Sequence, residues 1–400
     1  MQLNSDVLNR ISYLVGSAEI AAQLPSVPAL TPFGENTVSY LNDVSRELMK
    51  DPRSKAYSDV VTFAFWIRKG SVLKLKERFD AEGLHLGKGV AFHIAPSNVP
   101  VNFAYSLVSG LLCGNANVVR VPSKEFAQVG IIADALNKVM SNHPEMKPYV
   151  LCVRYSRDKD INDLFSSIAD VRIVWGGNNT IAELRQSPLP PRSGEITFAD
   201  RYSLAVIDSD SYLFIKEKAK VAEDFYNDTF FSDQNACTSP RIIVWTGSRI
   251  QEAKDAFWKI EHEYAKNKYT FQSIQAVNKL TKSCLIAVQE SGVKVEEHQD
   301  NLIIRVSVPR ITDYLMDFRD NSGYFYEYDC ADILDLIPLC NDKRCQTIAY
   351  IGDRNALLPL VQSGVKGIDR IVPLGKTMDF DLIWDGYNLP ALLTRTIVVA

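Results

Sequence analysis

The sequence lacks the features by which several classes of protein are recognised. It contains no run of roughly 18 uncharged apolar residues, the length that a membrane-spanning helix requires. Its N-terminal segment carries Asp6, Arg10 and Glu19 where a signal peptide would need an apolar core. The seven cysteines form no CxxC pair and the histidines show no HExxH or HxH spacing, so neither a disulfide framework nor a metal site is indicated. These absences predict a cytoplasmic protein with no membrane span and no metal.

A long basic stripe is also missing. The 400 residues carry a net charge of -4 and the pI is near 5.8, whereas binding to nucleic-acid phosphates needs clustered lysine and arginine. This argues against nucleic acid or an anionic membrane as the main partner. With 46% hydrophobic and 23% charged residues the chain has a globular composition, and it is longer than one compact core can organise. We therefore expect two domains.

Short β-branched runs alternate with helical patterns in the first half of the chain. The alternation predicts strands at 89–94, 117–121, 149–155, 171–177 and 203–208, and helices at 101–114, 124–140, 160–168 and 179–186. This order is typical of an α/β fold, in which an open parallel sheet is covered by helices on both faces. No GxGxxG motif occurs, so an ordinary Rossmann fingerprint is absent.

The second half again mixes the two kinds of element. Helices are predicted at 216–231 and 251–267, and strands at 241–245, 301–308 and 347–352. No internal repeat or low-complexity tract interrupts this pattern. The second half is therefore a further α/β unit.

Two places are indicated for the domain boundary. One is the Pro- and Gly-rich stretch "QSPLPPRSG" at 186–194, and the other follows "SLAVIDSD" at 203–210. We place the boundary at the second, which gives domains at 1–210 and 211–375 and a C-terminal segment at 376–400. The β-branched tail "TRTIVVA" ends that segment. Because an end strand of this kind commonly pairs with another chain, we expect a homo-oligomer.

The turn "HIAPSNVPVNF" follows the strand predicted at 89–94. Ligands of open α/β sheets bind beyond the carboxyl ends of the strands, so this turn faces a binding edge. Asn98 would project its amide there, although local grounds alone favour a simpler role as the cap of the following helix or in an Asx-turn. The candidate residues of the turn are Ala95, Pro96, Ser97 and Asn98.

A second candidate, "GNANVVRVPSKEF", places Arg120, Pro122, Ser123 and Lys124 between a strand end and a helix start. Backbone N–H groups and the helix dipole favour anions at such a place, and two added cations suit a phosphate. The alternative is equally supported on local grounds: Ser123 is only an N-cap and Lys124 a solvated surface residue.

A third candidate is the pair Gly176 and Gly177 in "VRIVWGGNNT", which follows a strand and precedes a helix. The missing side chains allow a ligand to approach the backbone closely. A lone Gly-Gly pair is a weak signal, and it gains meaning only together with the other candidates.

The fourth candidate is Cys237, in "FFSDQNACTSPR". Free cysteine most often packs as a small buried side chain, which is the alternative to a nucleophile here. Cys237 precedes a strand by three residues, and a tight loop at that junction exposes a backbone N–H that could hold an oxyanion. No neighbouring histidine activates the thiol as in a protease dyad, so a Cys-His hydrolase would need a distant histidine.

In chain order these four stretches resemble the aldehyde dehydrogenase superfamily, and most closely its LuxC-type acyl-CoA reductases. "HIAPSNVPVNF" is similar to the Pro-Trp-Asn-Phe-Pro segment, "CGNANVVRVPSKE" to the Lys-Pro-Ser-Glu segment, and "QNACTSPR" to the catalytic-cysteine segment. The terminal "LGKTMDFDLIWDGYNLPALLTR" resembles the LuxC-type C-terminus, including its Trp-Asp-Gly at Trp384 to Gly386. The similarity runs from about residue 60 onward.

The resemblance implies an aldehyde-dehydrogenase-like fold with two three-layer α/β domains, the first built on an open parallel sheet for the cofactor. It implies that 1–210, with an N-terminal helical region, binds the cofactor, that 211–375 carries the catalytic cysteine, and that 376–400 returns and ends in the oligomerisation strand. It assigns Cys237 as nucleophile and Asn98 as oxyanion donor. The implied cofactor-binding residues are Ala95, Pro96, Ser97, Arg120, Pro122, Ser123, Lys124, Gly176 and Gly177.

Two departures from the superfamily pattern are informative. Phe198 stands where hydrolytic members carry the glutamate that activates water, unless Glu195, a few residues upstream, takes that part. Without a base the acyl-enzyme resists water, which favours thioester chemistry. Val121 replaces the ribose-binding lysine and Lys124 replaces its glutamate, an exchange that favours NADPH because a cation can pair with a 2′-phosphate.

The sequence is therefore interpreted as an NADPH-dependent acyl-CoA reductase that forms an aldehyde through an acyl-cysteine. Two related alternatives remain open, an NAD-dependent aldehyde dehydrogenase and an acyl-phosphate reductase, and a third from a different class, a non-catalytic partner in an acyl-transfer complex. The expected partners are an acyl-CoA or another acyl thioester, and an acyl-protein synthetase or acyltransferase.

Overall fold

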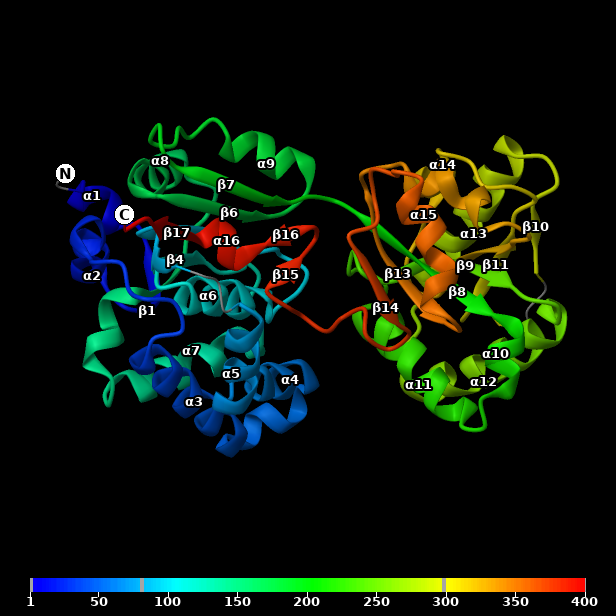
Figure 1. The fold of residues 1–400 in the computed structure, drawn as a ribbon, viewed down its shortest axis with the longest axis horizontal. Coiled ribbons are helices and arrows are strands. Elements are labelled where there is room, and N and C mark those ends of the chain that lie inside the picture. The colour runs from blue at the N-terminus through cyan, green and yellow to red at the C-terminus, as the bar shows by residue number, and fades with distance from the viewer. Residues whose placement is uncertain (1–2, 80–82, 297–299, 400) are drawn as a thin grey trace. The chain divides into compact units, whose positions relative to one another are not determined.

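The computed structural model describes residues 3–79, 83–296 and 300–399. The chain forms two compact units, each with its own sheet (Figure 1). Unit 1 comprises residues 1–199 and 381–400, and unit 2 comprises residues 200–380. Among the described residues of the whole chain, no helix is long and apolar enough to cross a lipid bilayer.

Unit 1 is built on a six-stranded sheet in the order β1-β5-β4-β3-β6-β7. Its strands are β1 (Ser12–Val15), β3 (Val90–Ile94), β4 (Ala116–Arg120), β5 (Val150–Arg154), β6 (Val171–Trp175) and β7 (Gly194–Phe198). All neighbours are parallel except β1 and β5. The chain order runs outward from β3 in both directions, so the gap between β3 and β6 is a topological switch point, where open α/β sheets bind ligands.

Helices cover both faces of this sheet, which explains why its central strands are almost wholly apolar. His93 of β3 contacts Ser106 on one face, whereas the neighbouring Phe92 packs against Phe165 on the other, with ring centroids 5.4 Å apart. The helices of the unit are α1 (Ser5–Leu8), α2 (Ala18–Gln23), α3 (Glu35–Lys50), α4 (Ser58–Trp66), α5 (Lys69–Arg78), α6 (Asn102–Leu112), α7 (Ala127–Met140), α8 (Lys159–Ile168), α9 (Asn178–Leu184) and α16 (Leu389–Leu393).

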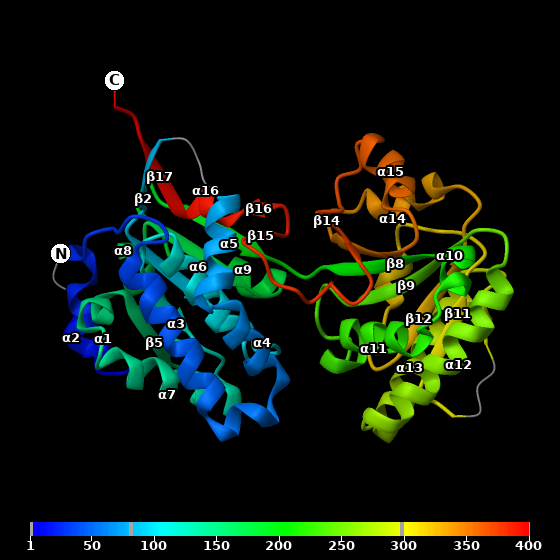
Figure 2. The ribbon, with the colours of Figure 1, turned by 60° about the horizontal axis from the view of Figure 1, so that its bottom comes forward.

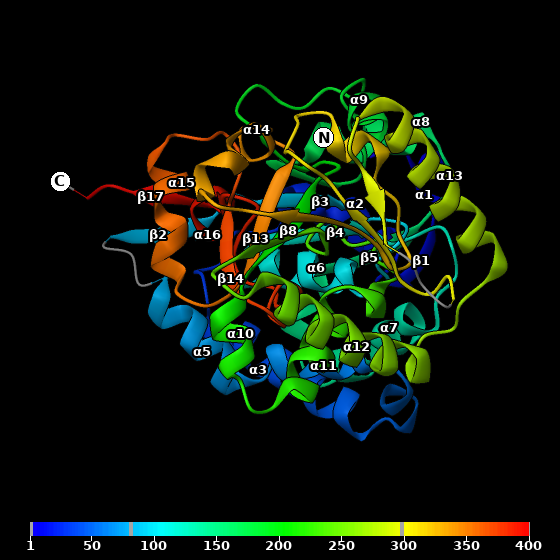
Figure 3. The ribbon, with the colours of Figure 1, turned by 90° about the vertical axis from the view of Figure 1, so that its right-hand side faces the viewer.

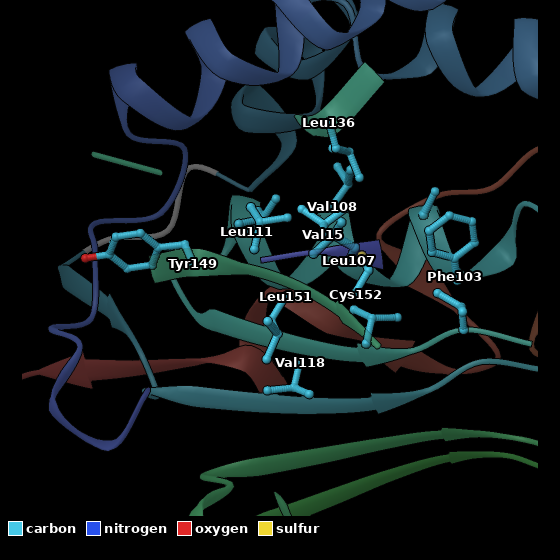
Figure 4. Close-up of a cluster of buried hydrophobic side chains, with 14 of the residues drawn as sticks. Val15, Phe103, Leu107, Val108, Leu111, Val118, Leu136, Tyr149, Leu151 and Cys152 are labelled. Atoms are coloured by element: carbon cyan, nitrogen blue, oxygen red, sulfur yellow. The ribbon is translucent and has the colours of Figure 1, made fainter. Parts of the chain in front are cut away.

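The core of unit 1 is one continuous apolar cluster. Figure 4 shows part of it, with Leu107, Val108 and Leu111 from α6 and Cys152 from β5. α3 packs outside α7, where the Tyr40 hydroxyl donates to the Leu136 carbonyl oxygen at 3.2 Å. The N-terminal helices thus form an outer layer on the sheet domain.

Unit 2 contains a seven-stranded sheet in the order β10-β11-β12-β9-β8-β13-β14. Its strands are β8 (Tyr202–Asp208), β9 (Pro240–Thr246), β10 (Lys294–Val295), β11 (Ile304–Ser307), β12 (Tyr324–Asp329), β13 (Cys345–Ile351) and β14 (Arg370–Pro373). Only β10 runs antiparallel to its neighbour among these strands.

Alternate residues of β8 belong to two separate cores. Leu204 and Val206 join the cluster that includes α13 (Ser273–Gln289), α14 (Ile337–Cys340) and α15 (Leu358–Gln362). Ala205 and Ile207 join the cluster that includes α10 (Ser209–Phe214), α11 (Lys218–Asp228) and α12 (Ile250–Lys268). Figure 3 shows α10 to α12 on one side of the sheet and α14 and α15 on the other. The unit therefore has three layers, as expected of an α/β domain.

The unit boundaries differ from the expected ones at 210 and 375. β8, which was assigned to the first domain, pairs with β9 and β13 in the middle of the second sheet. The chain therefore crosses between units at 199–200, before β8, and crosses back at 380–381. A strand of this composition fits either sheet, and only its hydrogen-bonded neighbours decide to which it belongs.

The expected strand near the C-terminus is present as β17 (Thr394–Ile397). It pairs antiparallel with β2 (Leu84–Gly87) of the same chain, as Figure 2 shows. Val398 and Val399 beyond it are exposed. Pairing of this ribbon with a second chain stays a prediction.

Candidate active site

Three of the predicted segments follow neighbouring strands of unit 1. Ile94 at the end of β3 is opposite both Arg120 of β4 and Val174 of β6. The segments that leave these strands therefore emerge side by side, with the β3 turn in the middle. They contain, in order, Ala95 to Asn98, Arg120 to Lys124, and Gly176 with Gly177. The structure thus brings together every cofactor-binding residue predicted in unit 1.

Asn98 lies exposed in the turn between β3 and α6. α6 begins at Asn102, and its N-cap is Val101, which makes no side-chain capping bond. The local explanation of Asn98 as the helix cap is therefore wrong. Asn98 lies at the carboxyl edge of the sheet, where the superfamily resemblance leads us to expect an oxyanion donor.

The basic corner after β4 departs from the prediction. α7 begins at Ala127 with Phe126 as N-cap, so Ser123 and Lys124 precede the helix instead of starting it. The Lys124 ammonium lies 5.1 Å from the Phe126 ring centroid and remains exposed. The Arg120 guanidinium lies 4.6 Å from the ring centroid of Tyr155. Any anion at this corner would meet side-chain cations, and the expected helix N-terminus is not there to assist.

The glycine pair after β6 is shaped by two different constraints. Gly176 donates its N–H to the Phe198 carbonyl oxygen at 3.1 Å, and a side-chain carbon there would come within 3.2 Å of Thr180. Gly177 is the N-cap of α9, and a side-chain carbon there would meet no atom within 4 Å. Packing within the chain accordingly does not require a glycine at 177.

An aromatic stack ends strands β6 and β7. Trp175 and Phe198 are paired residues on these strands, and their ring centroids are 3.6 Å apart with planes inclined by 14°. The ring of Tyr387 meets Phe198 edge-on at 5.5 Å. Phe198 is only 5% exposed. Phe198, which the superfamily resemblance aligns with the water-activating glutamate, is thus a packed hydrocarbon ring.

Glu195 does not replace that glutamate. It receives a hydrogen bond from Arg172 at 2.9 Å and another from Arg185 at 2.7 Å. Burial by itself would raise the pKa of Glu195, but the hydrogen bonds from Arg185 and Arg172 outweigh it and the pKa is lowered. Strand alternation also directs Glu195 to the opposite face of β7 from Phe198. A carboxylate bound in this way is a poor proton acceptor.

A buried polar chain fixes the orientation of Trp175. The indole N–H donates to Ser106 Oγ at 3.0 Å, and Ser106 Oγ lies 2.7 Å from His93 Nδ1. His93 Nε2 is 3.0 Å from Asn117 Oδ1. Burial lowers the pKa of His93 to about 4, so the ring is neutral. The Asn117 amide nitrogen donates to the Asn115 and Tyr149 carbonyl oxygens, so the Asn117 oxygen that faces Nε2 can only accept. The proton of the neutral His93 is therefore on Nε2, and Nδ1 accepts from the Ser106 hydroxyl.

In unit 2, Cys237 lies on the turn that precedes β9, which we call the Cys237 turn (residues 233–239). Asp233 and Gln234 begin it with φ values of 53° and 51°, in the left-handed region. The buried Gln234 side chain accepts hydrogen bonds from the N–H groups of Gly323 at 2.7 Å and Tyr324 at 3.2 Å. The strained entry to the turn is therefore held by a buried amide.

Cys237 itself is half-buried, and its carbonyl oxygen accepts a hydrogen bond from Ser203 Oγ at 2.8 Å. Ser203 Oγ in turn accepts from the N–H of Thr347 at 3.2 Å. The backbone of the cysteine is thus tied to the two strands β8 and β13 next to it. A fixed backbone is what a nucleophile and an oxyanion N–H require.

A buried arginine supports the same turn. Arg241 donates to the Asp320 carbonyl oxygen at 2.6 Å, and also to Asn321 and to the Gln234 carbonyl oxygen. Burial lowers the pKa of Arg241 to about 10, while Cys237 is among the neighbours that act in the other direction. A fixed positive charge therefore lies close enough to interact with the thiol.

Neither Gln234 nor Arg241 was predicted as a site residue. Both lie in the quoted stretch around Cys237, and an arginine directly before the apolar run "IIVW" was the available signal, because such a position is expected to be buried. Among the described residues no group of three or more His, Cys, Asp or Glu side chains is arranged to hold a metal ion.

Solved structures similar to this chain include several aldehyde dehydrogenases. The NAD-dependent benzaldehyde dehydrogenase of Corynebacterium glutamicum matches with a TM-score of 0.63 and 14% identity, over 99% of this chain and 95% of that one. Lactaldehyde dehydrogenase of Escherichia coli matches with a TM-score of 0.64 and 13% identity, over 100% of this chain and 91% of that one. These matches define the fold as that of the aldehyde dehydrogenases.

The chain belongs to the LuxC acyl-CoA reductase family, whose model matches residues 71–395. It is 24% identical over 294 residues to a long-chain acyl-protein thioester reductase of Aliivibrio fischeri, and 25% identical over 294 residues to one of Vibrio harveyi. Each match covers 72% of this chain. It covers 58% of the first relative and 59% of the second, so the chain spans less than two thirds of their length.

Proposed function

We propose that this protein reduces an acyl-CoA, or another fatty acyl thioester, to the aldehyde through an acyl-Cys237 intermediate, with NADPH as reductant. One observation carries the proposal: the position of the hydrolytic base is filled by Phe198, stacked on Trp175. The names of the relatives, long-chain acyl-protein thioester reductases, support the same substrate class. The acyl donor is either CoA or an acyl-protein.

In the first step the Cys237 thiolate forms a bond to the thioester carbonyl carbon. The amide of Asn98 and the N–H of Cys237 hold the oxyanion of the tetrahedral state, and the positive charge of Arg241 favours a thiolate near it. The C–S bond to CoA then breaks, and the departing thiolate takes up a proton. One thioester replaces another, so the two states are nearly equal in energy and the protein has only to stabilise the tetrahedral state.

The acyl-enzyme must then survive until it is reduced. The Trp175–Phe198 stack offers no proton acceptor, and Glu195 is bound by two arginines. Neither position would therefore supply water at the thioester with a general base, which typically contributes about 100 to 10,000-fold to such a reaction. A slower hydrolysis of the acyl-enzyme is the expected consequence.

The residues at the carboxyl edge of unit 1 fit a dinucleotide. The edge lies at the switch point of the sheet, Gly177 leaves its surroundings open for close approach, and the exposed Lys124 offers a cation for a 2′-phosphate. Ala95, Ser97 and Ser123 would contribute backbone and hydroxyl groups beside it. Bound NADPH supplies the hydride for reduction of the acyl group, and Cys237 is regenerated when the aldehyde leaves.

The proposal is tested by mass spectrometry of the intact protein after incubation with acyl-CoAs of graded chain length. A mass increase equal to the acyl group, located on Cys237 and absent in Cys237→Ser, is the expected result. Acid released from an aldehyde without CoA would instead identify an NAD-dependent aldehyde dehydrogenase. An adduct from acyl phosphate but not from acyl-CoA would identify an acyl-phosphate reductase. If neither compound gives an adduct, the protein is a non-catalytic partner.

A further inference from the structure

A buried carboxylate at the end of α11 binds a distant loop of unit 2. Asp228 is 0% exposed, and its two oxygens accept hydrogen bonds from the N–H of Gly375 at 2.6 Å and the N–H of Thr377 at 3.1 Å. Both donors belong to the loop that follows β14, which we call loop 374–379. Thr377 is itself fully buried. The carboxylate is therefore the acceptor for two backbone donors, one of which has no access to solvent.

The carbonyl groups of the same loop are bound by a cation. Arg370, in β14, donates to the carbonyl oxygens of Thr377 at 3.0 Å, Asp379 at 3.1 Å and Lys376 at 3.4 Å. Asp228 accepts hydrogen bonds from two backbone N–H groups of the loop, and Arg370 donates hydrogen bonds to three of its carbonyl oxygens. A six-residue segment without regular secondary structure is thereby fixed by two side chains of opposite charge.

Loop 374–379 contacts the Cys237 turn. The hydroxyl of Thr238 donates to Met378 Sδ at 3.1 Å. Thr238 is 2% exposed and directly follows Cys237. The methionine therefore lies over the residue next to the proposed nucleophile.

The end of α11 anchors the Cys237 turn as well. The N–H of Gln234 donates to the carbonyl oxygen of Thr229 at 2.9 Å, and Thr229 is the residue after Asp228. One helix end thus holds both partners of the Thr238–Met378 contact.

We propose that Asp228 is a positioning residue that holds loop 374–379 against the Cys237 turn, so that Met378 restricts access to the Cys237 thiol and fixes the turn for acyl transfer. The effect on acyl transfer rests on the proposed function, whereas the restricted access does not. The two parts are therefore measured separately.

Access is measured by alkylation of the folded, full-length protein with iodoacetamide, followed by peptide mass spectrometry. Cys284 on α13 is exposed and provides an internal reference, because the other described cysteines apart from Cys237 are buried. In Asp228→Ala both acceptors are lost, and we expect the Cys237-to-Cys284 alkylation ratio to rise on the order of tenfold, because a buried N–H left without a partner favours opening of the loop. Asp228→Asn keeps one acceptor and should restore part of the protection.

Glu223→Ala is the matched control. Glu223 is a carboxylate of the same helix, pairs with Lys220 at the surface, and has no part in the loop, so the ratio should stay at the wild-type value. Met378→Ala is a second route to the same result, which serves if Asp228→Ala does not fold. An unchanged ratio in folded Asp228→Ala, or in Met378→Ala if that is the variant that folds, overturns the proposal.

Acyl transfer is followed by the rate at which acyl-CoA modifies Cys237. We expect Asp228→Ala to lose on the order of tenfold in this rate while its alkylation by iodoacetamide becomes faster, a pair of opposite changes that general destabilisation would not produce. If the wild-type protein is not acylated at all, the proposed function fails, and the alkylation ratio still decides the positioning role.

Discussion

Trp175 and Phe198 stack with ring centroids 3.6 Å apart at the carboxyl ends of the paired strands β6 and β7. The orientation of the Trp175 ring is fixed by its hydrogen bond to Ser106, and Ser106 is held in turn by its hydrogen bond with His93. Phe198 is therefore held as a packed aromatic ring with no group that could accept a proton.

Phe198→Glu should increase the rate at which water hydrolyses the acyl-enzyme. A carboxylate at this position offers a general base beside the acyl-enzyme, and we expect acid release from acyl-CoA to increase by about tenfold or more over the wild type. Release of free acid and of CoA is measured without reductant. Phe198→Leu is the control, because it removes the aromatic stack without adding a base; equal hydrolysis in both variants would contradict the assigned role.

Asn98→Ala should slow acylation of Cys237 by about 100 to 1000-fold, the usual loss for one oxyanion donor. Asn98 and Cys237 belong to different units, so the experiment asks whether both serve one active site. The measurement is the rate of adduct formation under single-turnover conditions. Ser97→Ala, a change at the neighbouring exposed position, should leave that rate almost unaltered. An undiminished rate in Asn98→Ala would remove Asn98 from the catalytic site.

Lys124→Glu should reverse the preference between the two nicotinamide cofactors. The exposed ammonium is the group proposed for the 2′-phosphate, and its replacement by a carboxylate should raise the KM for NADPH by about tenfold or more while changing that for NADH little. Steady-state kinetics with both cofactors tests this. Lys147→Glu, at an exposed lysine just before the N-terminal end of β5, controls for the change in net charge; the same shift there would argue against a specific contact.

The free energy of unfolding should depend on pH because Asp228 titrates. Burial raises the pKa of Asp228 to about 7, well above its ordinary value near 4, despite the opposing backbone hydrogen bonds from loop 374–379. The folded protein therefore holds a proton that the unfolded chain has released, and the free energy of unfolding should fall as the pH rises from about 4 to 7 and level off above.

Asp228→Asn should remove this dependence. Three pH units correspond to at most about 4 kcal/mol, so the difference between wild type and variant is measurable by denaturant unfolding at pH 5 and pH 7.5. Glu261, whose pKa is also raised by burial, contributes a slope of the same sign in both proteins and cancels in the difference. Parallel curves for the two proteins would show that Asp228 is not the titrating group.

Much of unit 1 follows from its sequence pattern. The β-branched runs predicted β3, β4, β5 and β6, and the intervening patterns predicted α6 and α8, because strands covered on both faces are almost purely apolar. β7 was missed, since "GEITF" directly follows a Pro-rich stretch and carries Glu195, whose charge is paired with two arginines in the structure. The start of α7 was placed too early, because Ser123 suggested a cap that the structure does not form.

The support of the Cys237 turn could not be predicted. Gln234, Arg241 and Asp228 are polar residues whose partners, such as Gly323 and Gly375, are far away in the sequence. No local spacing relates a buried polar group to such a partner. Cys237 is proposed from its motif, whereas the groups that hold its turn became visible only in three dimensions.

The return of residues 381–400 to unit 1 has a consequence for synthesis of the protein. Unit 2 is a continuous segment and can fold as soon as it has left the ribosome. The six-stranded sheet of unit 1 lies within residues 12–198, but β2 finds its partner β17 only after the whole of unit 2 has been made. The first part of the chain to be translated is therefore the last to be completed, and until then the edge of β2 is exposed to pairing with any other strand in the cell.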